Sequence, residues 1–461
     1  DKIRFRSGFP EKLGGWIKLS ATNFLGIARS MWNWATLNGS NLLGVGTNLK
    51  YYVENGGVYN DITPIVTTDN YTNALSTGFT TLAATINATA TTFTVVNDFN
   101  FPPQNGIVKI GSEVIFYNTM SSNVASSCIR GYNNTTAASH NSGSNVASAF
   151  FVWRDTNNDA NDRDFVIFSN CSISSVGGIA NTTINGEHQV FKYTSGIDFA
   201  LATTADNNLS NVTFCTSSVS NVANVTVQYE YPVGLPVYSL GTGWGAGPWS
   251  RGGWGSAYTG AGVGQQLRLW SNDNYGQDLI IAPRGGAIFY WVAANGVGNR
   301  AKYLADLANT ASIGSGVWVP KTTNQVISSA IQRFVIAYGA NSYDPLDSNT
   351  TFDPMLVRWS DQENPYDWVP AATNQAGEFR LSNGSYIMAA RSTRQEILVW
   401  TDSAIYSQQY LGPPYVWGFQ ILMDNISIMS PNSAITINNV TYWMGTDKFY
   451  MYSGRVETLP C

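Results

Sequence analysis

The fold of this chain is decided by a repeated hairpin, seen most clearly in the stretch LIIAPRGGAIFYW at residues 279–291. An apolar arm, a polar turn and an aromatic arm follow one another, which is the pattern of two antiparallel strands. The same pattern returns at residues 42–53, 397–406 and 440–452. Four such hairpins in one chain indicate an architecture that is built from repeats.

Tryptophans recur at a regular distance in the second half of the chain. Trp318, Trp359, Trp400 and Trp443 lie 41 to 43 residues apart, and a strand-ending Trp about every 40–50 residues is typical of propeller blades. A blade is a twisted sheet that cannot bury both faces by itself, so neighbouring blades stack around an axis with aromatic side chains between them. We therefore expect an all-β chain that forms a β-propeller, with an array of β-sandwiches as the alternative.

The repeat is interrupted between residues 68 and 232, where Asn, Thr, Ser and Ala dominate. Short β-branched runs in this interval predict two inserted β domains, and a blade loop accepts an insertion at little entropic cost. The expected organisation is an N-terminal arm with the first blade at 1–67, a small β domain at 68–149, a second β domain, or platform, at 150–232, and the remaining blades at 233–461. We expect one short helix, around residues 301–311.

Composition excludes several classes of protein. The chain has 461 residues, 25 Lys and Arg against 30 Asp and Glu, a net charge of −5, 12% charged residues and 13% aromatic residues. Helical repeats need more charge, disordered chains have fewer aromatics, and free-standing nucleic-acid binders are usually basic. No apolar run approaches the roughly 18 residues of a membrane-spanning helix, so we expect no membrane insertion. The widely spaced Cys128, Cys171, Cys215 and Cys461 predict neither a zinc site nor a disulfide framework.

Five segments resemble structural tail proteins of tailed bacteriophages. They are RFRSGFPEKLGGW at 4–16, VGTNLKY at 45–51, DITPI at 61–65, RWSDQENPYDW at 358–368 and the stretch 394–417. The family contains the propeller-bearing hub or nozzle proteins at the distal end of the short tail, also described as DNA-stabilisation proteins. Residues 80–147 also resemble a small β module that recurs as an insertion in phage virion proteins.

The resemblance implies a structural component of the virion tail that is not an enzyme. Such proteins form homo-oligomeric rings, commonly hexamers, below the portal and adaptor rings. They line the channel through which double-stranded DNA leaves, and they give a platform for fibres or spikes. The visible hairpins leave open how many blades there are and whether the natural chain continues past Cys461.

A Gly-rich stretch at 241–264 is a candidate contact region of such a ring. It contains Trp244, Trp249, Arg251 and Trp254, and several Trp are rarely left in water without a partner. Because no GK[ST] ending and no following helix accompany the glycines, the stretch is not a phosphate-binding loop. We expect a loop that packs on a neighbouring subunit or narrows the channel.

The N-terminal arm is a second candidate contact region. It carries the basic residues Lys2, Arg4, Arg6 and Lys12. Basic side chains of this kind suit either an acidic adaptor ring or the phosphates of DNA. The arm is therefore expected to face one of these two partners.

Sites of catalysis and metal binding find little support. His140 and His188 lie far apart and no Gly-x-Ser-x-Gly motif is present, so a nucleophilic triad is not predicted. Residues 155–166 have oxygen ligands spaced as in a calcium loop but lack its Gly and its final Glu. We expect no catalytic residue, cofactor or metal.

Propellers also include glycan-degrading enzymes, which use two carboxyl groups. Asp361, Glu363 and Asp367 superficially resemble the aspartate box of sialidases but lack its Gly, so a solvated turn is the preferred interpretation. The alternative function is a glycan-binding or glycan-degrading β-propeller on a virion or cell surface.

Overall fold

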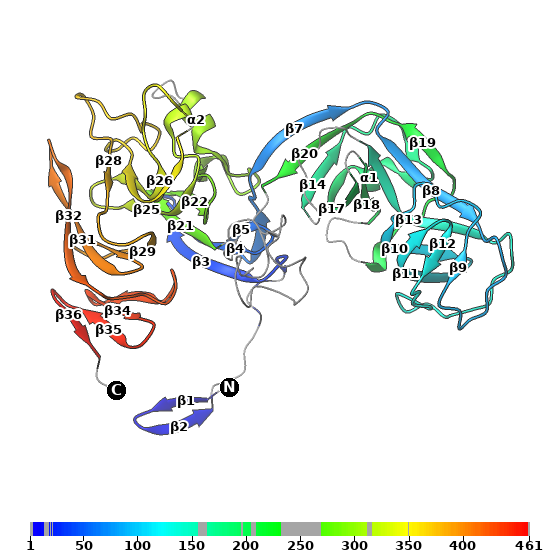
Figure 1. Ribbon diagram of the computed structural model, residues 1–461, viewed down its shortest axis with the longest axis horizontal. Helices are drawn as coiled ribbons and strands as arrows, with labels where there is room; N and C mark the ends of the chain where they lie inside the picture. The colour runs from blue at the N-terminus through cyan, green and yellow to red at the C-terminus, as the bar shows by residue number, and fades with distance from the viewer. Residues whose placement is uncertain are drawn as a thin grey trace, which may run out of the picture. The chain divides into compact units, whose positions relative to one another are not determined.

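The computed structural model describes residues 3–12, 18, 20, 22–154, 164–194, 197–203, 209–231, 269–310, 316–348 and 350–459. The chain divides into two compact units, one made of residues 1–64 and 233–461, the other of residues 65–232 (Figure 1). Strands dominate both units. The described residues contain two short α-helices, α1 (Asn181–Ile184) and α2 (Leu304–Thr310). In this part of the chain no helix has the length and apolar character needed to cross a membrane.

The described residues of the first unit form five four-stranded antiparallel sheets, each with its strands in chain order. Blade 1 is β3 (Ala28–Ala35), β4 (Asn41–Thr47), β5 (Tyr51–Asn55) and β6 (Val58–Asp61). Blade 2 is β21 (Trp270–Tyr275), β22 (Asp278–Pro283), β23 (Phe289–Trp291) and β24 (Lys302–Tyr303). Blade 3 is β25 (Thr323–Ser329), β26 (Phe334–Asn341), β27 (Phe352–Trp359) and β28 (Gly377–Arg380). Blade 4 is β29 (Ile387–Ser392), β30 (Ile397–Thr401), β31 (Ala404–Gly412) and β32 (Val416–Asp424). Blade 5 is β33 (Ala434–Ile437), β34 (Val440–Met444), β35 (Phe449–Tyr452) and β36 (Val456–Thr458).

This arrangement is a β-propeller, as the sequence predicts. Each of the four hairpins recognised in the sequence forms the second and third strands of a blade, in blades 1, 2, 4 and 5. Blade 3 escaped the pattern because residues 342–351 separate its second and third strands. The single helix expected around 301–311 is α2.

The even tryptophan spacing is not the blade period, which corrects the sequence interpretation. Trp318 lies in a 3₁₀ turn (η3, Gly316–Trp318), Trp359 ends a third strand, and Trp400 and Trp443 lie in second strands. The first strands of blades 2 to 5 begin at residues 270, 323, 387 and 434. Because the loops differ in length, the repeats are unequal, and the equal Trp distances are a coincidence of position.

Aromatic side chains nevertheless fill the interfaces between blades. Trp34 packs edge-on against Trp291 between blades 1 and 2, with ring centroids 6.3 Å apart. Trp400 and Trp443 meet at 5.4 Å between blades 4 and 5. Such pairs contribute about 0.5–1.5 kcal/mol each beyond the burial of their area. The tryptophans therefore bind blade to blade, as propeller packing requires.

The second unit, residues 65–232, is one extended sheet with smaller additions. Its longest path runs β7 (Ile65–Tyr71), β20 (Val225–Glu230), β14 (Phe165–Ser169), β17 (Gly186–Thr194), β18 (Ile197–Leu201), β13 (Asn145–Arg154), β10 (Gln104–Ile110), β11 (Glu113–Ser121), β12 (Val124–Ser126) and β9 (Phe93–Thr94). Strand β8 (Leu75–Thr81) pairs with β13 and with β19 (Val219–Val222), while β15 (Ser175–Val176) and β16 (Ile179–Ala180) form a separate pair. The described part of the chain also has a 3₁₀ turn at η1 (Leu209–Asn211) and another at η2 (Ala293–Asn295), the latter in the first unit.

Two separate inserted domains at 68–149 and 150–232 are not confirmed. The expected division falls inside β13, which pairs with β10 and β8 and also with β18. The expected boundary after residue 67 likewise falls inside β7. One long strand joins the two parts into a single sheet, so a boundary read from composition does not mark a break in the structure.

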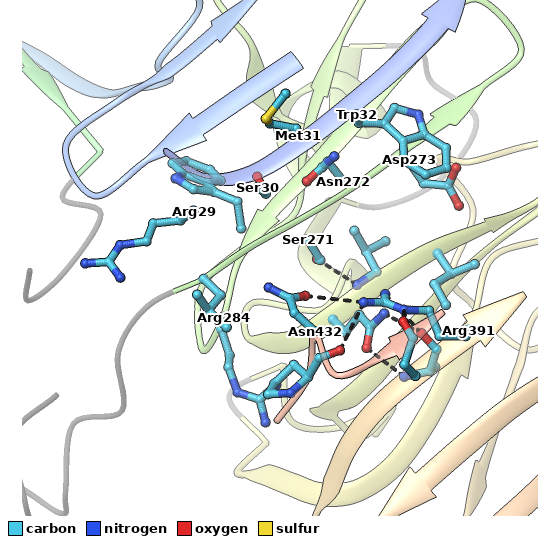
Figure 2. A pocket seen from close by; sticks show the side chains of 18 of the residues that line it. Arg29, Ser30, Met31, Trp32, Ser271, Asn272, Asp273, Arg284, Arg391 and Asn432 are labelled. Carbon is cyan, nitrogen blue, oxygen red and sulfur yellow. Dashed lines mark hydrogen bonds between the residues drawn. The ribbon is translucent and has the colours of Figure 1, made fainter. Parts of the chain in front are cut away.

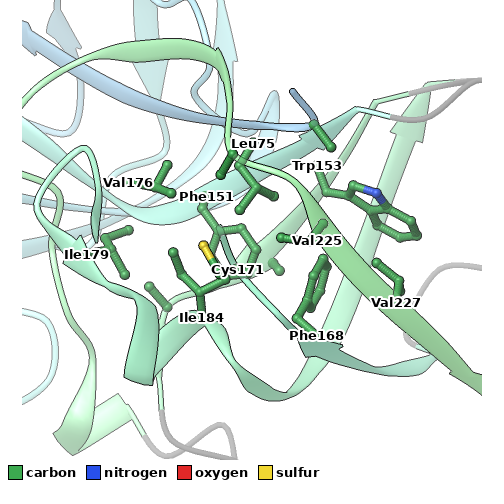
Figure 3. Close-up of a cluster of buried hydrophobic side chains, with 14 of the residues drawn as sticks. Leu75, Phe151, Trp153, Phe168, Cys171, Val176, Ile179, Ile184, Val225 and Val227 are labelled. Carbon is green, nitrogen blue, oxygen red and sulfur yellow. The ribbon is translucent and has the colours of Figure 1, made fainter. Parts of the chain in front are cut away.

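The second unit nevertheless contains distinct hydrophobic cores. Figure 3 shows one, in which Phe151, Trp153 and Phe168 meet side chains from several strands. Another is confined to residues between Leu82 and Val146. That second core coincides with the segment 80–147, so the module recognised in the sequence has its own apolar interior.

Candidate functional site

The N-terminal arm is a two-stranded hairpin, β1 (Ile3–Arg6) paired with β2 (Phe9–Lys12). Ser7 and Gly8 form its turn with φ of 52° and 83°, and two consecutive positive φ values are those of the tight turns that join such strands. Every described side chain from Arg4 to Lys12 is exposed. An isolated two-stranded hairpin is at best marginally stable in water, so the pairing of β1 with β2 gives this arm little stability of its own.

The two faces of the arm differ in chemistry. Phe5 lies opposite Pro10, and both are exposed, Phe5 to 76%. Because side chains alternate along a strand, Arg4, Arg6 and Phe9 belong to the other face. Arg4 donates to Glu11 at 2.9 Å, an exposed pair that contributes little stability. The arm thus presents aromatic rings together with a surplus of positive charge.

Of the predicted contact residues, Arg4, Arg6 and Lys12 lie together on this hairpin. Lys2 lies outside the described residues, as do Trp244, Trp249, Arg251 and Trp254 of the Gly-rich stretch and residues 155–163 of the calcium-like loop.

The motifs at 45–51 and 61–65 meet in one buried cluster around Asp61. Its carboxylate accepts from the buried Lys50 ammonium at 2.7 Å and from the Arg300 guanidinium at 3.2 Å. Its other oxygen accepts from the backbone N–H and hydroxyl of Thr63. Burial opposes ionisation of Asp61, but Lys50 and Arg300 outweigh it and hold the pKa of the carboxyl below its usual value. The cluster fastens the last strand of blade 1 to the end of blade 2.

The motif at 358–368 is explained by a second buried charge. Arg358 is only 3% exposed and donates to the carbonyl oxygens of Asn341, Trp318 and Trp368 at 2.9–3.0 Å. Its guanidinium also lies 6.0 Å from the centre of the Trp368 ring. Burial lowers the pKa of Arg358 to about 10. One side chain therefore ties three loops of blade 3 together.

The carboxylates that resemble an aspartate box are used to build a turn. Asp361 accepts from the backbone N–H groups of Gln362 and Gln375. Asp367 accepts from the backbone of Val369 and the side chain of Asn374, and Glu363 forms an exposed pair with Arg333. This geometry agrees with the solvated-turn interpretation and sets up no opposed pair of carboxyls around a substrate.

The two histidines are held in separate structural settings in the second unit. His188 is buried, its ring nitrogens lie 3.0–3.1 Å from backbone carbonyl oxygens, and burial lowers its pKa. His140 lies 2.8 Å from the buried carboxylate of Glu113. Glu113 also accepts a two-point contact from Arg130 and the backbone N–H of Gly131 and Ala138. These contacts close the loop of the small module.

The propeller has an axial cavity of about 620 Å³ that is partly open to solvent. Residues from the first strands of all five blades, β3, β21, β25, β29 and β33, line it. Its charged lining residues are Arg29, Arg284, Arg391 and Asp273 (Figure 2). The sequence interpretation missed this site because the first strands lie outside the recognised hairpins and far apart in the chain. Arg284 is the one residue of the cavity lining that lies within a recognised motif, in the turn of the hairpin at 279–291.

The comparisons with known proteins leave the family open. No protein-family model matches the chain, and no curated protein matches it. Among solved structures, a similar chain is PorZ, an essential bacterial surface component of the type-IX secretion system of Porphyromonas gingivalis. It is 8% identical with a TM-score of 0.22, over 91% of this chain and 73% of PorZ. A similarity at this level carries no argument about function.

Proposed function

We propose that this chain is a structural, non-enzymatic subunit of a bacteriophage tail, placed in the hub or nozzle ring at its distal end. In this role it forms a homo-oligomeric ring, commonly a hexamer, that contacts the adaptor and portal rings and carries fibres or spikes. Double-stranded DNA passes through the channel that the ring encloses. The observation that carries the proposal is the exposed N-terminal hairpin, which is built for a partner.

The charge of the hairpin indicates what that partner is. The arm has three described cations, Arg4, Arg6 and Lys12, and one carboxylate, Glu11. The whole chain instead has an excess of acidic residues, with a net charge of −5. Besides the acidic adaptor ring or DNA expected from the sequence, a basic arm therefore also complements the rest of a second copy of the chain, and opposite charge guides such an encounter. Phe5 and Phe9 would supply the apolar contacts that hold the arm once it has docked.

The interior of the blades supports a mechanical role. Charged contacts at the partly buried Asp61 and the buried Arg358 fasten loops at the motifs that resemble tail proteins. Asp361, a candidate catalytic carboxylate under the glycan-degrading alternative, instead accepts hydrogen bonds from backbone N–H groups of its own turn. These contacts hold the loops of the blades in place, which suits a subunit that guides DNA.

A photo-crosslinking experiment tests the proposal. Phe5 is replaced by a photoreactive phenylalanine analogue, and the same analogue at Leu346, an exposed loop residue, serves as the matched control. The analogue at position 5 is expected to give covalent multimers on illumination, while the control gives none. Imaging of the same sample is expected to show rings.

A chain that stays monomeric at every concentration and salt, with no crosslink from position 5, would contradict the ring. Cleavage of a host polysaccharide by the purified chain would instead favour the glycan-degrading alternative.

A further inference from the structure

The axial cavity of the propeller has the dimensions of a ligand site. Its volume of about 620 Å³ falls in the range of roughly 300–1,000 Å³ that is usual for sites of small molecules. The lining is mixed: Ser271, Asn272, Asn432 and the four charged residues lie among apolar side chains such as Trp270 and Ile327. Three of those four are arginines and one is a carboxylate, so positive charge predominates.

Arg391 is held in place by neutral groups. Its Nη2 donates to the carbonyl oxygen of Pro431 at 3.0 Å and to Oδ1 of Asn432 at 3.3 Å, and Nε donates to the carbonyl oxygen of Ala434 at 3.3 Å (Figure 2). These acceptors orient the guanidinium between blades 4 and 5 without carrying a compensating charge. Burial lowers the pKa of Arg391, which reflects the energetic penalty of a cation in this setting.

Arg284 reaches the cavity from the end of blade 2. It is 8% exposed, and its Nη1 donates to the carbonyl oxygen of Met388 at 3.1 Å. Burial lowers the pKa of this group as well. Arg29 approaches from the first strand of blade 1. Cations from three different blades therefore lie around one space.

Asp273 does not cancel this charge at mildly acidic pH. Its two oxygens accept from the backbone N–H groups of Asn274 and Ser328 at 2.8 and 2.9 Å. Burial raises its pKa to about 6, with Arg391 opposing that shift. The other charged groups on the strands beside it are Arg29 on β3, Asp278 at the start of β22 and Arg284 directly after the end of β22. Below pH 6 the carboxyl is mostly protonated, and the cavity becomes more positive.

We propose that the axial cavity binds a small multivalent oxyanion, a phosphate or a polycarboxylate, through Arg391, Arg284 and Arg29. Guanidinium groups match both kinds of oxyanion because each presents paired N–H donors in a fork. An anion would also offset the penalty of burying Arg284 and of holding the half-buried Arg29 and Arg391 in the same cavity. The proposal is independent of the role in a phage tail, since it rests only on the interior of the propeller.

Calorimetric titration of the full chain tests the proposal, with inorganic phosphate and citrate as probes at pH 5.5 and pH 8. At least one probe is expected to bind with 1:1 stoichiometry, and the affinity for the same ionised form of that probe is expected to be higher at pH 5.5 than at pH 8. The probe that binds more tightly identifies the oxyanion class. Asp273→Asn is expected to strengthen binding at pH 8 and to remove most of the pH dependence that the chain itself contributes.

Variants separate the cavity from general charge attraction. Arg391→Gln is expected to weaken binding at least tenfold. Arg29→Gln is the second variant, because Arg29 lies on β3 of blade 1 and its loss leaves the bonds of Arg391 between blades 4 and 5 in place. Weaker binding by this variant is therefore not explained by misfolding at blades 4 and 5. Arg455→Gln removes the same charge from an exposed position and is expected to leave the affinity within twofold. Absence of binding by both probes at millimolar concentration would overturn the proposal. Equal weakening by Arg455→Gln and Arg29→Gln would do the same.

Discussion

Glu113 illustrates how single charged residues fix loops in this chain. Its carboxylate is fully buried and receives Arg130, His140 and two backbone N–H groups. Burial alone would raise its pKa, but these donors outweigh it and lower the pKa of Glu113 to about 2, from 4.5. The charged form is therefore the one that the fold stabilises.

Glu113→Gln is expected to destabilise the unit of residues 65–232 by about 3–5 kcal/mol, because Arg130 would remain buried without its carboxylate. Urea unfolding followed by tyrosine and tryptophan fluorescence measures the change. A loss below about 1 kcal/mol would contradict the role of this cluster.

The same carboxylate predicts a dependence of stability on pH. Because its folded pKa is depressed, its contribution is complete above pH 4.5, the unfolded value, and is lost as the pH falls toward about 2. The shift corresponds to about 3 kcal/mol. Unfolding of the parent chain and of Glu113→Gln is compared across this range, and the variant is expected to lack this part of the acid sensitivity.

At the scale of the element, a blade is held by its loops as much as by its strands. Arg358→Lys is expected to destabilise the propeller by about 1–3 kcal/mol, since a lysine cannot reproduce three directed bonds to carbonyl oxygens. Arg380→Lys is the matched control, because Arg380 is exposed and forms a surface pair with Asp353. The control is expected to change the free energy of unfolding by less than about 0.5 kcal/mol. Equal effects of the two variants would show that the buried bonds of Arg358 are unimportant.

Packing between blades 1 and 2 depends on the absence of a side chain at Gly46. A Cβ atom there would lie 2.5 Å from Trp270 Cδ1 and 2.5 Å from Ser30 Oγ. Gly46→Ala is therefore expected to push blade 2 from blade 1 and to lower the melting temperature by several degrees. Gly298→Ala, where a Cβ meets open space, is expected to leave it nearly unchanged.

The elements that could be predicted from sequence are those whose signal is local. The second and third strands of four blades are adjacent, apolar and joined by short turns, so their hairpins were recognisable. The first strands of blades 1 and 2 were not, because in β3 exposed and buried residues alternate imperfectly and in β21 the only buried residue is Trp270. The axial cavity is assembled from those strands, and no local pattern brings Arg29, Arg284 and Arg391 together.

At the scale of the whole molecule, each compact unit has its own hydrophobic interior. We expect calorimetry of the full chain to resolve two unfolding transitions. Glu113→Gln should move only the transition of residues 65–232, and Gly46→Ala only that of the propeller. A single transition displaced equally by both variants would contradict this independence.

The position of the insertion has a consequence for biosynthesis. Blade 1 ends at Asp61, and the next strand of the propeller among the described residues begins at Trp270. At about 5–20 residues per second, a ribosome needs roughly 10–40 s to make the intervening segment. Throughout that interval Trp34 and Tyr51, which later pack on Trp291 and Trp270, emerge without their partners. The nascent first blade is thus a natural substrate for chaperones, and slowing translation after residue 61 should raise the fraction of chain lost to aggregation.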